Sequence, residues 1–228
     1  MIKAVLLDAD DTLLDFHKAE HEALKKTLLT TGIEPRDQII ELYSGINKRH
    51  WDMLERGELT RAEVLTRRFE AFFAEFGVEG DAQKTQDRYA TYLSQGHWFI
   101  PGAIALLDAL YSKYKLYLVT NGNAKVQQGR LASANIAHYF EEIFISELIG
   151  CTKPSKAFFN YCFSRMPPYK EDEIIIIGDS LTSDIQGGIN AGIHTCWFNP
   201  RGNAGRADIV PEYTVSALEE IPALLDNL

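Results

Sequence analysis

Five short apolar runs, separated by longer segments with helical spacing, constrain the fold of this chain more than any other feature. The runs are Ile2–Leu7, Leu116–Thr120, Ile143–Ser146, Ile174–Ile177 and Thr195–Phe198. Each is too short for a helix and is mostly apolar, as expected of a strand that is buried on both faces of a sheet. Strands that alternate with helices predict an α/β fold with a doubly wound, mainly parallel, Rossmann-like sheet.

One long segment interrupts this alternation. Residues 16–96 carry helical patterns and no convincing strand. Helix start signals stand at Asp15, Thr60–Glu63 (a capping box) and Asp81, and helix stop signals stand at Gly57 and Gly77. These signals predict four helices inserted after the first strand. We therefore expect a core of residues 1–15 and 97–228 and a helical-bundle cap of residues 16–96.

Composition excludes several classes of protein. The apolar runs are too short to span a bilayer, so we expect no membrane association. Three cysteines without paired spacing argue against a disulfide scaffold and against a cysteine-based zinc site. The first apolar run ends at Asp8 and is too short for a secretory signal, which predicts a cytoplasmic protein. The net charge of −9 disfavours binding to nucleic acid polymers, and it also repels small anions.

Polar side chains cluster just past the ends of four of the predicted strands. They are Asp8, Asp10 and Thr12 after the first strand, Thr120, Asn121 and Gly122 after the second, Lys153 after the third, and Asp179 and Asp184 after the fourth. Each group alone could equally belong to an ordinary loop, to a helix cap or, for Lys153, to an exposed surface. Because the carboxyl ends of parallel strands meet at one edge of a sheet, the four groups together predict one shared site.

The order of these groups carries a family resemblance. Along the chain they read D-x-D-x-T, T-N-G, K-P and G-D-x4-D. This order resembles the four motifs of the haloacid dehalogenase-like (HAD) phosphohydrolases, and the inserted helices resemble their cap domain. The resemblance covers nearly the whole chain. Within that superfamily, the segments Arg56–Thr60, Asn190–Gly192 and Cys196–Asn199 resemble the branch of pyrimidine 5′-nucleotidases.

The chemistry of the first motif agrees with the resemblance. The Asp8 carboxylate is the best nucleophile candidate, since it can attack phosphorus and form an aspartyl-phosphate. Asp10 is placed to protonate the leaving ester oxygen and then to activate water. True dehalogenases of the superfamily lack a carboxylate at the position of Asp10, so its presence favours phosphate esters over haloacids. Thr12 is expected to fix the turn rather than to touch substrate.

The charge of the predicted site calls for a cation. Two carboxylates ~5 Å apart repel by roughly 3 kcal/mol at an effective dielectric of ~20, so a phosphate dianion would not enter unaided. Mg²⁺ prefers oxygen ligands and would offset this charge. The resemblance implies three ligands, namely the Asp8 carboxylate, the Asp10 backbone carbonyl and Asp179. It further implies that Asp184 orients the ligands or Lys153.

The remaining groups would hold the phosphate. The resemblance implies that Lys153 pairs with the phosphate and holds Asp8. The hydroxyl of Thr120 and the backbone amides of Asn121 and Gly122 are expected to bind phosphate oxygens.

The cap offers fewer signals. Its aromatic side chains fall at helical spacing among Ile and Leu and are predicted to be core residues: Tyr43, Trp51 and Tyr89. Its arginines could face substrate, but solvent is the favoured prediction: Arg49, Arg67 and Arg68. The spacing of His17 and His21 could bind metal, but without a third ligand we predict that they lie on the cap surface or in the linker.

The leading hypothesis is a Mg²⁺-dependent phosphomonoesterase with a mobile cap that closes over the site. Its partner would be a small-molecule phosphate ester, with pyrimidine nucleoside 5′-monophosphates implied by the resemblance, and the enzyme would be a monomer or a homodimer. The alternatives are a sugar-phosphate or phosphoglycolate phosphatase, a phosphomutase of the same fold, and a catalytically silent binding protein. The intact set of Asp8, Asp10, Lys153 and Asp179 argues against a silent protein, since such a protein has no need for the repulsion between these carboxylates.

Overall fold

The computed structural model describes residues 1–228 and confirms the α/β fold class. Six strands form one sheet in the order β3-β2-β1-β4-β5-β6, and every neighbouring pair is parallel. The strands are β1 (Ala4–Asp8), β2 (Lys115–Thr120), β3 (Glu142–Ile145), β4 (Ile174–Gly178), β5 (His194–Phe198) and β6 (Tyr213–Val215). The strand order reverses beside β1, and in such a sheet ligands bind at that point, beyond the carboxyl ends of the strands.

Helices cover both faces of the sheet. The core helices are α5 (Ala103–Tyr111), α6 (Ala124–Ala134), α7 (Ser146–Ile149), α8 (Lys156–Arg165), α9 (Gln186–Ala191) and α10 (Ile221–Leu225). Shorter helical turns are η1 (Ala137–Tyr139), η2 (Glu171–Glu173), the π-helical η3 (Leu181–Ile185) and η4 (Leu218–Glu220). Alternate residues of β1 enter different hydrophobic clusters: Val5 and Leu7 pack with α5 and α10, whereas Leu6 packs with α8. The strands are therefore buried on both faces, which explains their continuous apolar sequence.

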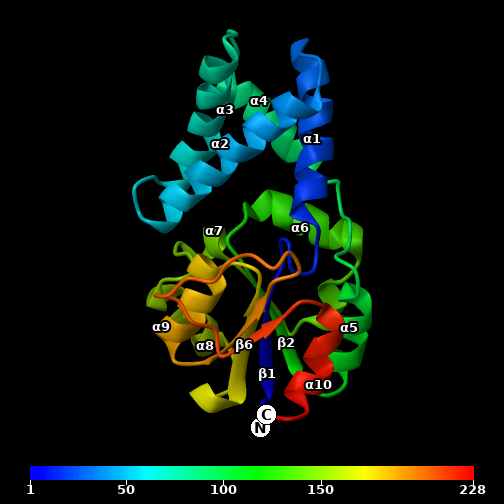
Figure 1. Cartoon of the computed structure of the whole chain (residues 1–228), viewed down its shortest axis with the longest axis vertical. Helices are drawn as coiled ribbons and strands as arrows, with labels where there is room; N and C mark the ends of the chain where they lie inside the picture. Colours follow the sequence, from blue (N-terminus) through cyan, green and yellow to red (C-terminus); the bar gives the residue numbers. More distant parts are fainter.

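The inserted helices form a bundle with its own hydrophobic cluster. They are α1 (Phe16–Thr31), α2 (Asp37–Glu55), α3 (Arg61–Phe76) and α4 (Ala82–Leu93). Figure 1 shows the bundle standing on one end of the sheet, with both chain termini at the opposite end. Its cluster includes Tyr43, Phe69, Phe72 and Tyr89, all fully buried. A core separate from that of the sheet supports the proposed division into a cap of residues 16–96 and a two-part core domain.

The helix ends follow from the sequence signals. Asp15 and Asp81 each accept a hydrogen bond from a backbone N–H of the first turn, at 2.8 and 2.9 Å. Thr60 and Glu63 form the predicted capping box of α3. Gly57, just past α2, has a φ of 73°, a left-handed conformation that glycine adopts without steric cost. These local interactions explain why the helix starts could be read correctly from the sequence.

The strand bounds differ from the sequence prediction by one or two residues, β1 being Ala4–Asp8 rather than Ile2–Leu7, and one strand was not predicted. Ser146, predicted as the last residue of a strand, begins helix α7 instead. The strand β6 was not predicted, because its three residues are too few to show a period and it pairs only with β5 at the edge of the sheet. No helix of the structure is both long and apolar enough to cross a membrane.

Candidate active site

The loop that follows β1 brings two carboxylates and a threonine to the edge of the sheet. Asp8 is the last residue of β1, and its side chain is 9% exposed. The Thr12 hydroxyl donates to Asp8 Oδ2 at 3.3 Å and accepts a hydrogen bond from the backbone N–H of Asp179 at 3.1 Å. Thr12 thereby ties the loop after β1 to the loop after β4.

Lys153 lies at the centre of the site and is 1% exposed. Its ammonium donates to Asp8 Oδ1 at 2.6 Å, to Asp184 Oδ1 at 2.6 Å and to the carbonyl of Val119 at 2.8 Å, which uses all three of its protons. Burial alone would lower the pKa of Lys153, but Asp184 and Asp8 outweigh burial and raise it. The lysine therefore stays charged. The side chain of Asn121 holds its backbone, donating to the Lys153 carbonyl and accepting from the Lys153 N–H, each at 2.9 Å.

Three carboxylates crowd around this single lysine. Oxygen atoms of Asp8, Asp179 and Asp184 lie within 4.8 Å of one another. Burial raises the pKa of Asp8 to about 8, although Lys153 lowers it. Burial, together with Asp8 and Asp184, raises the pKa of Asp179 well above its usual range. The cluster therefore holds more negative charge than the protein itself neutralises.

The donor set of this cluster fits a hard divalent cation. All the side-chain donors are carboxylate oxygens, which Mg²⁺ prefers over nitrogen or sulfur. Asp184 is already committed, because Oδ1 accepts from Lys153 and Oδ2 accepts from the Ser180 N–H at 3.1 Å. Asp179, whose carboxylate accepts no hydrogen bond, and Asp8, whose Oδ2 accepts only the longer 3.3 Å bond from Thr12, are the carboxylates best suited to hold the ion, and Asp184 orients Lys153.

The predicted phosphate-binding residues lie in the loop between β2 and α6. The backbone N–H of Gly122 donates to Thr120 Oγ1 at 3.2 Å. Asn123 begins α6, and its Oδ1 accepts from the N–H of Val126 at 3.1 Å. The loop of Thr120, Asn121 and Gly122 therefore sits at a helix N-terminus beside Lys153, an arrangement that favours anions.

Two residues of α6 belong to the site but were missed in the sequence. Gln127 donates to Asp10 Oδ2 at 2.7 Å and to Thr120 Oγ1 at 2.6 Å. Arg130, fully buried, forms an ion pair with Asp10 Oδ1. Gln127 and Arg130 are three residues apart just after the T-N-G motif, which puts both side chains on one face of α6. This spacing was the only sequence signal that could have assigned them to the site. Both oxygens of Asp10 are therefore held by α6.

The cap and the core together line an open-mouthed cavity of about 530 Å³. Two cap residues bridge to the core: Arg61 donates to the carbonyls of Asn121 and Gly122 at 2.7 and 3.0 Å, and Glu55 accepts from the Thr182 hydroxyl at 2.7 Å. Side chains from the cap and from the core line the same space. A ligand that reaches Asp8 is therefore surrounded by both parts of the chain.

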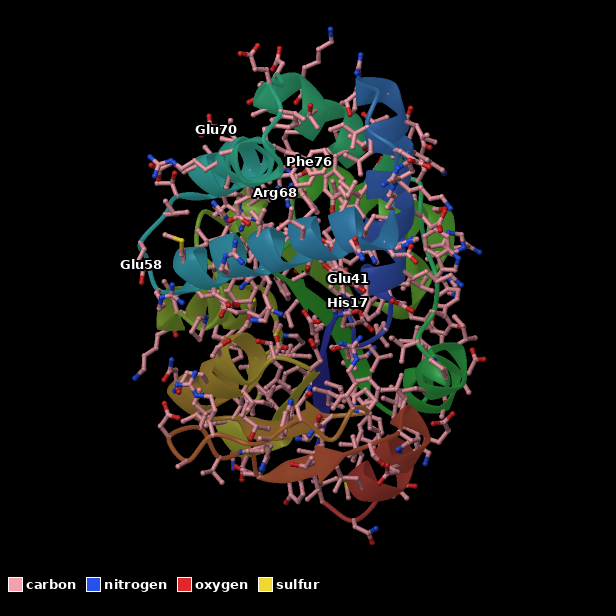
Figure 2. All side chains as sticks on the ribbon, turned by 45° about the horizontal axis from the view of Figure 1, so that its top comes forward. His17, Glu41, Glu58, Arg68, Glu70 and Phe76 are labelled. Carbon is pink, nitrogen blue, oxygen red and sulfur yellow. The ribbon has the colours of Figure 1, made fainter.

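Two predictions for the cap were wrong. Arg68, predicted to face solvent, is 3% exposed and lies inside the cap, whereas Glu58 stands at its outer edge (Figure 2). Trp51, predicted as a core residue, is only partly buried and lines the cavity. Tyr43 and Tyr89 are buried as predicted. His17 is half-exposed and pairs with Asp11 in the linker.

Comparison with known proteins assigns the family. Residues 2–192 match the model of the haloacid dehalogenase-like hydrolases. The chain belongs to this family. The HAD-hydrolase YfnB of Bacillus subtilis is 39% identical over 98% of this chain and 95% of its own length. A crystal structure of YfnB bound to magnesium superposes with a TM-score of 0.95 and covers 99% of both chains.

Two further relatives of this HAD hydrolase have activities in their names. The pyrimidine 5′-nucleotidase PynA of Streptococcus pneumoniae is 37% identical over 99% of this chain and 95% of its own length. The pyrimidine 5′-nucleotidase YjjG of Escherichia coli is 31% identical over 97% of this chain and 96% of its own length. These full-length relatives and the family match identify this HAD hydrolase as an enzyme of the phosphatase class.

Proposed function

We propose that this protein is a Mg²⁺-dependent phosphomonoesterase that works through an aspartyl-phosphate, with a pyrimidine nucleoside 5′-monophosphate as substrate. One observation carries the chemistry: the Asp8 carboxylate is held by a buried lysine at 2.6 Å, while Asp10, two residues further on, is held by α6 at the same cavity. A fixed nucleophile and a second carboxylate are what two-step phosphoryl transfer requires.

The two displacements follow from these positions. Asp8 attacks phosphorus, the ester P–O bond breaks, and Asp10 gives a proton to the leaving oxygen. A water molecule then attacks the aspartyl-phosphate, Asp10 accepts a proton from that water, and the P–O bond to Asp8 breaks to release inorganic phosphate. The positive charge of Lys153, the Thr120 hydroxyl and the backbone amide of Asn121 orient the phosphate between these groups, with Gly122 fixing the turn through its bond to Thr120.

Asp8, Asp179 and the backbone carbonyl of Asp10 would hold the metal ion. Mg²⁺ would supply positive charge that offsets the carboxylates and the phosphate. The magnesium bound to YfnB supports magnesium as the ion.

Pyrimidine nucleotides are the substrate class that the relatives support. PynA and YjjG, both named as pyrimidine 5′-nucleotidases, align with nearly the whole of this chain, including the cap. The cavity of about 530 Å³ falls within the range of roughly 300–1,000 Å³ typical of small-molecule sites. A cavity of this size is large enough for a single nucleotide.

A phosphate-release screen tests the proposal. The purified protein with Mg²⁺ is offered pyrimidine and purine nucleoside monophosphates, sugar phosphates and phosphoglycolate, and we expect the uridine and thymidine monophosphates to be turned over best. Asp8→Asn should abolish release with the fold intact, and excess EDTA should stop it. Turnover of a sugar phosphate with inert pyrimidine nucleotides would refute the substrate class, and full turnover by Asp8→Asn would refute the nucleophile.

A further inference from the structure

A buried polar cluster inside the cap has no role in the chemistry at Asp8. Glu20 of α1 accepts from Ser44 at 2.5 Å and from Asn47 at 2.5 Å, both on α2. Arg68 of α3 donates to Asn47 Oδ1 and to Gln86 Oε1 of α4, each at 2.6 Å. One residue or more from each cap helix thus joins a continuous hydrogen-bonded chain. Except for Ser44, its members are at most 6% exposed.

This cluster lines the same cavity as the phosphate site. Glu20, Asn47, Arg68 and Gln86 all contribute to the cavity wall that also includes Asp8. A cap that needed only stability would bury apolar side chains here, because a buried charge is costly even when it is paired. A polar cluster next to the apolar side chains of Phe16, Trp51 and Leu65 instead suits a ligand that has both an apolar face and a polar group.

Two donors of the cluster have no acceptor within the protein. The Nε of Arg68 is buried without a hydrogen-bond partner. Gln86 accepts from Arg68 through Oε1, which leaves its Nε2 as a donor that no protein group accepts. Glu20 accepts two hydrogen bonds, and a carboxylate has about four acceptor positions, so it can accept another. The cluster therefore offers two donors and one acceptor.

The charge of the cluster selects a neutral partner. Glu20 and Arg68 carry opposite formal charges and are linked through Asn47, so the cluster has no net charge. Each Nη of Arg68 already donates one hydrogen bond inside the cap, and Glu20 offsets its charge, so the guanidinium offers an anion little net attraction. A second phosphate or a carboxylate on the substrate would find little compensation here.

We propose that this cluster is the subsite for the hydrogen-bonding edge of a pyrimidine base, an inference that rests on the proposed nucleotidase function. Uracil and thymine present a carbonyl, a ring N–H and a second carbonyl in sequence. The Nε2 of Gln86 donates to a carbonyl of the base, and the charged groups of Glu20 and Arg68 behind it keep this end of the cavity polar. Trp51 and Phe16 supply apolar wall for the flat faces of the base.

Gln86→Leu tests the subsite, with Gln83→Leu as a matched control on the same helix. Gln83 is exposed and lies outside the cavity lining. The readout is the ratio of kcat/KM for uridine 5′-monophosphate to kcat/KM for ribose 5-phosphate, which carries the same sugar and phosphate without a base. Loss of one hydrogen bond to the base should lower this ratio about tenfold in Gln86→Leu, whereas Gln83→Leu should keep the wild-type ratio.

Gln86→Glu gives a second variant of nearly the same shape. It replaces the amide donor by an acceptor and keeps a partner for Arg68, so the cap stays folded while the ratio falls at least as far as in Gln86→Leu. An unchanged ratio in both variants would overturn the subsite while leaving the nucleotidase standing. A wild-type enzyme that hydrolyses ribose 5-phosphate but no pyrimidine nucleotide would overturn the nucleotidase and the subsite together.

Discussion

Replacing Arg130 by methionine should make the enzyme far more sensitive to the leaving group of its substrate. Arg130 is fully buried and pairs with Asp10, the proposed proton donor. Its Nε also donates to the carbonyl of Gly96 at 3.3 Å, and its guanidinium lies 5.6 Å from the centre of the Phe16 ring. Gly96 and Phe16 belong to the two connections between cap and core. Arg130 therefore holds Asp10 relative to both connections.

The size of the effect follows from these contacts. A positioned general acid contributes about 10²- to 10⁴-fold to the rate. Gln127 still donates to Asp10 at 2.7 Å in the variant, so we expect only part of this factor to be lost, about 10- to 100-fold for an alkyl ester. Hydrogen bonds to charged groups contribute about 1.5–3 kcal/mol, and Asp10 is 28% exposed, so water replaces part of that loss. The variant should therefore remain folded.

The assay is a series of aryl phosphates with leaving groups of decreasing pKa, ending with a nucleotide. A good leaving group needs little protonation, so its rate should change by less than about threefold, while the nucleotide shows the full loss. In a plot of log kcat/KM against leaving-group pKa, the slope becomes more negative in Arg130→Met.

The control is Arg165→Met, which removes an exposed arginine paired with Glu142 at 3.1 Å. It should leave both the rates and the slope unchanged. If Arg130→Met lowers every rate by one common factor, the arginine acts on the fold or on the cap as a whole, and its assigned effect on Asp10 is refuted.

Three further predictions concern stability. Burial, together with Asp8 and Asp184, raises the pKa of Asp179, so the folded state loses stability as pH rises through that pKa. Asp179→Asn should therefore stabilise the metal-free protein at alkaline pH by up to about 3 kcal/mol, the repulsion of two charges 4.8 Å apart, and raise its Tm. The variant should lose the further rise in Tm that Mg²⁺ gives the wild type in a thermal melt. Lys153→Met leaves Asp8 and Asp184 without their cation and should cost about 3–5 kcal/mol in urea denaturation, whereas wild-type stability would contradict the buried network. Burial raises the pKa of Glu20 above its usual 4.5, so the stabilising contribution of Glu20 is complete below pH 4.5 and is lost as pH rises through the pKa of the folded state. Glu20→Gln should therefore gain stability relative to the wild type between pH 4.5 and 7. Urea midpoints of the two proteins that change with pH in the same way would contradict this.

The sequence predicts the strand ends well because the relevant signals are local. A buried parallel strand is a continuous apolar run, and the polar residue that ends it, such as Asp8 or Thr120, must lie at the carboxyl edge of the sheet. Helix caps such as Asp15 are local for the same reason. The position of Asp8, Lys153 and Asp179 just at or after strand ends was therefore enough to predict that the three residues lie close together.

The two missed arginines depended on partners far along the chain. Arg130 meets Asp10 across 120 positions, and Arg68 meets Asn47 across 21 positions on another helix. An arginine in an amphipathic helix is normally exposed, and only the partner decides whether it can be buried. No local pattern of charge or hydropathy reports such a partner.

These arginines also share a property that stability alone does not explain. Each leaves a buried nitrogen without a hydrogen-bond partner, Nε in Arg68 and Nη2 in Arg130, and both line the cavity. An unsatisfied buried donor costs about 1–3 kcal/mol, more for a charged group. Apolar side chains of the same size would remove that cost. Three of the four buried side chains with an unpaired polar atom, Arg68, Tyr89 and Arg130, lie in the cavity wall, so a bound substrate that reorders this wall can offset part of the cost.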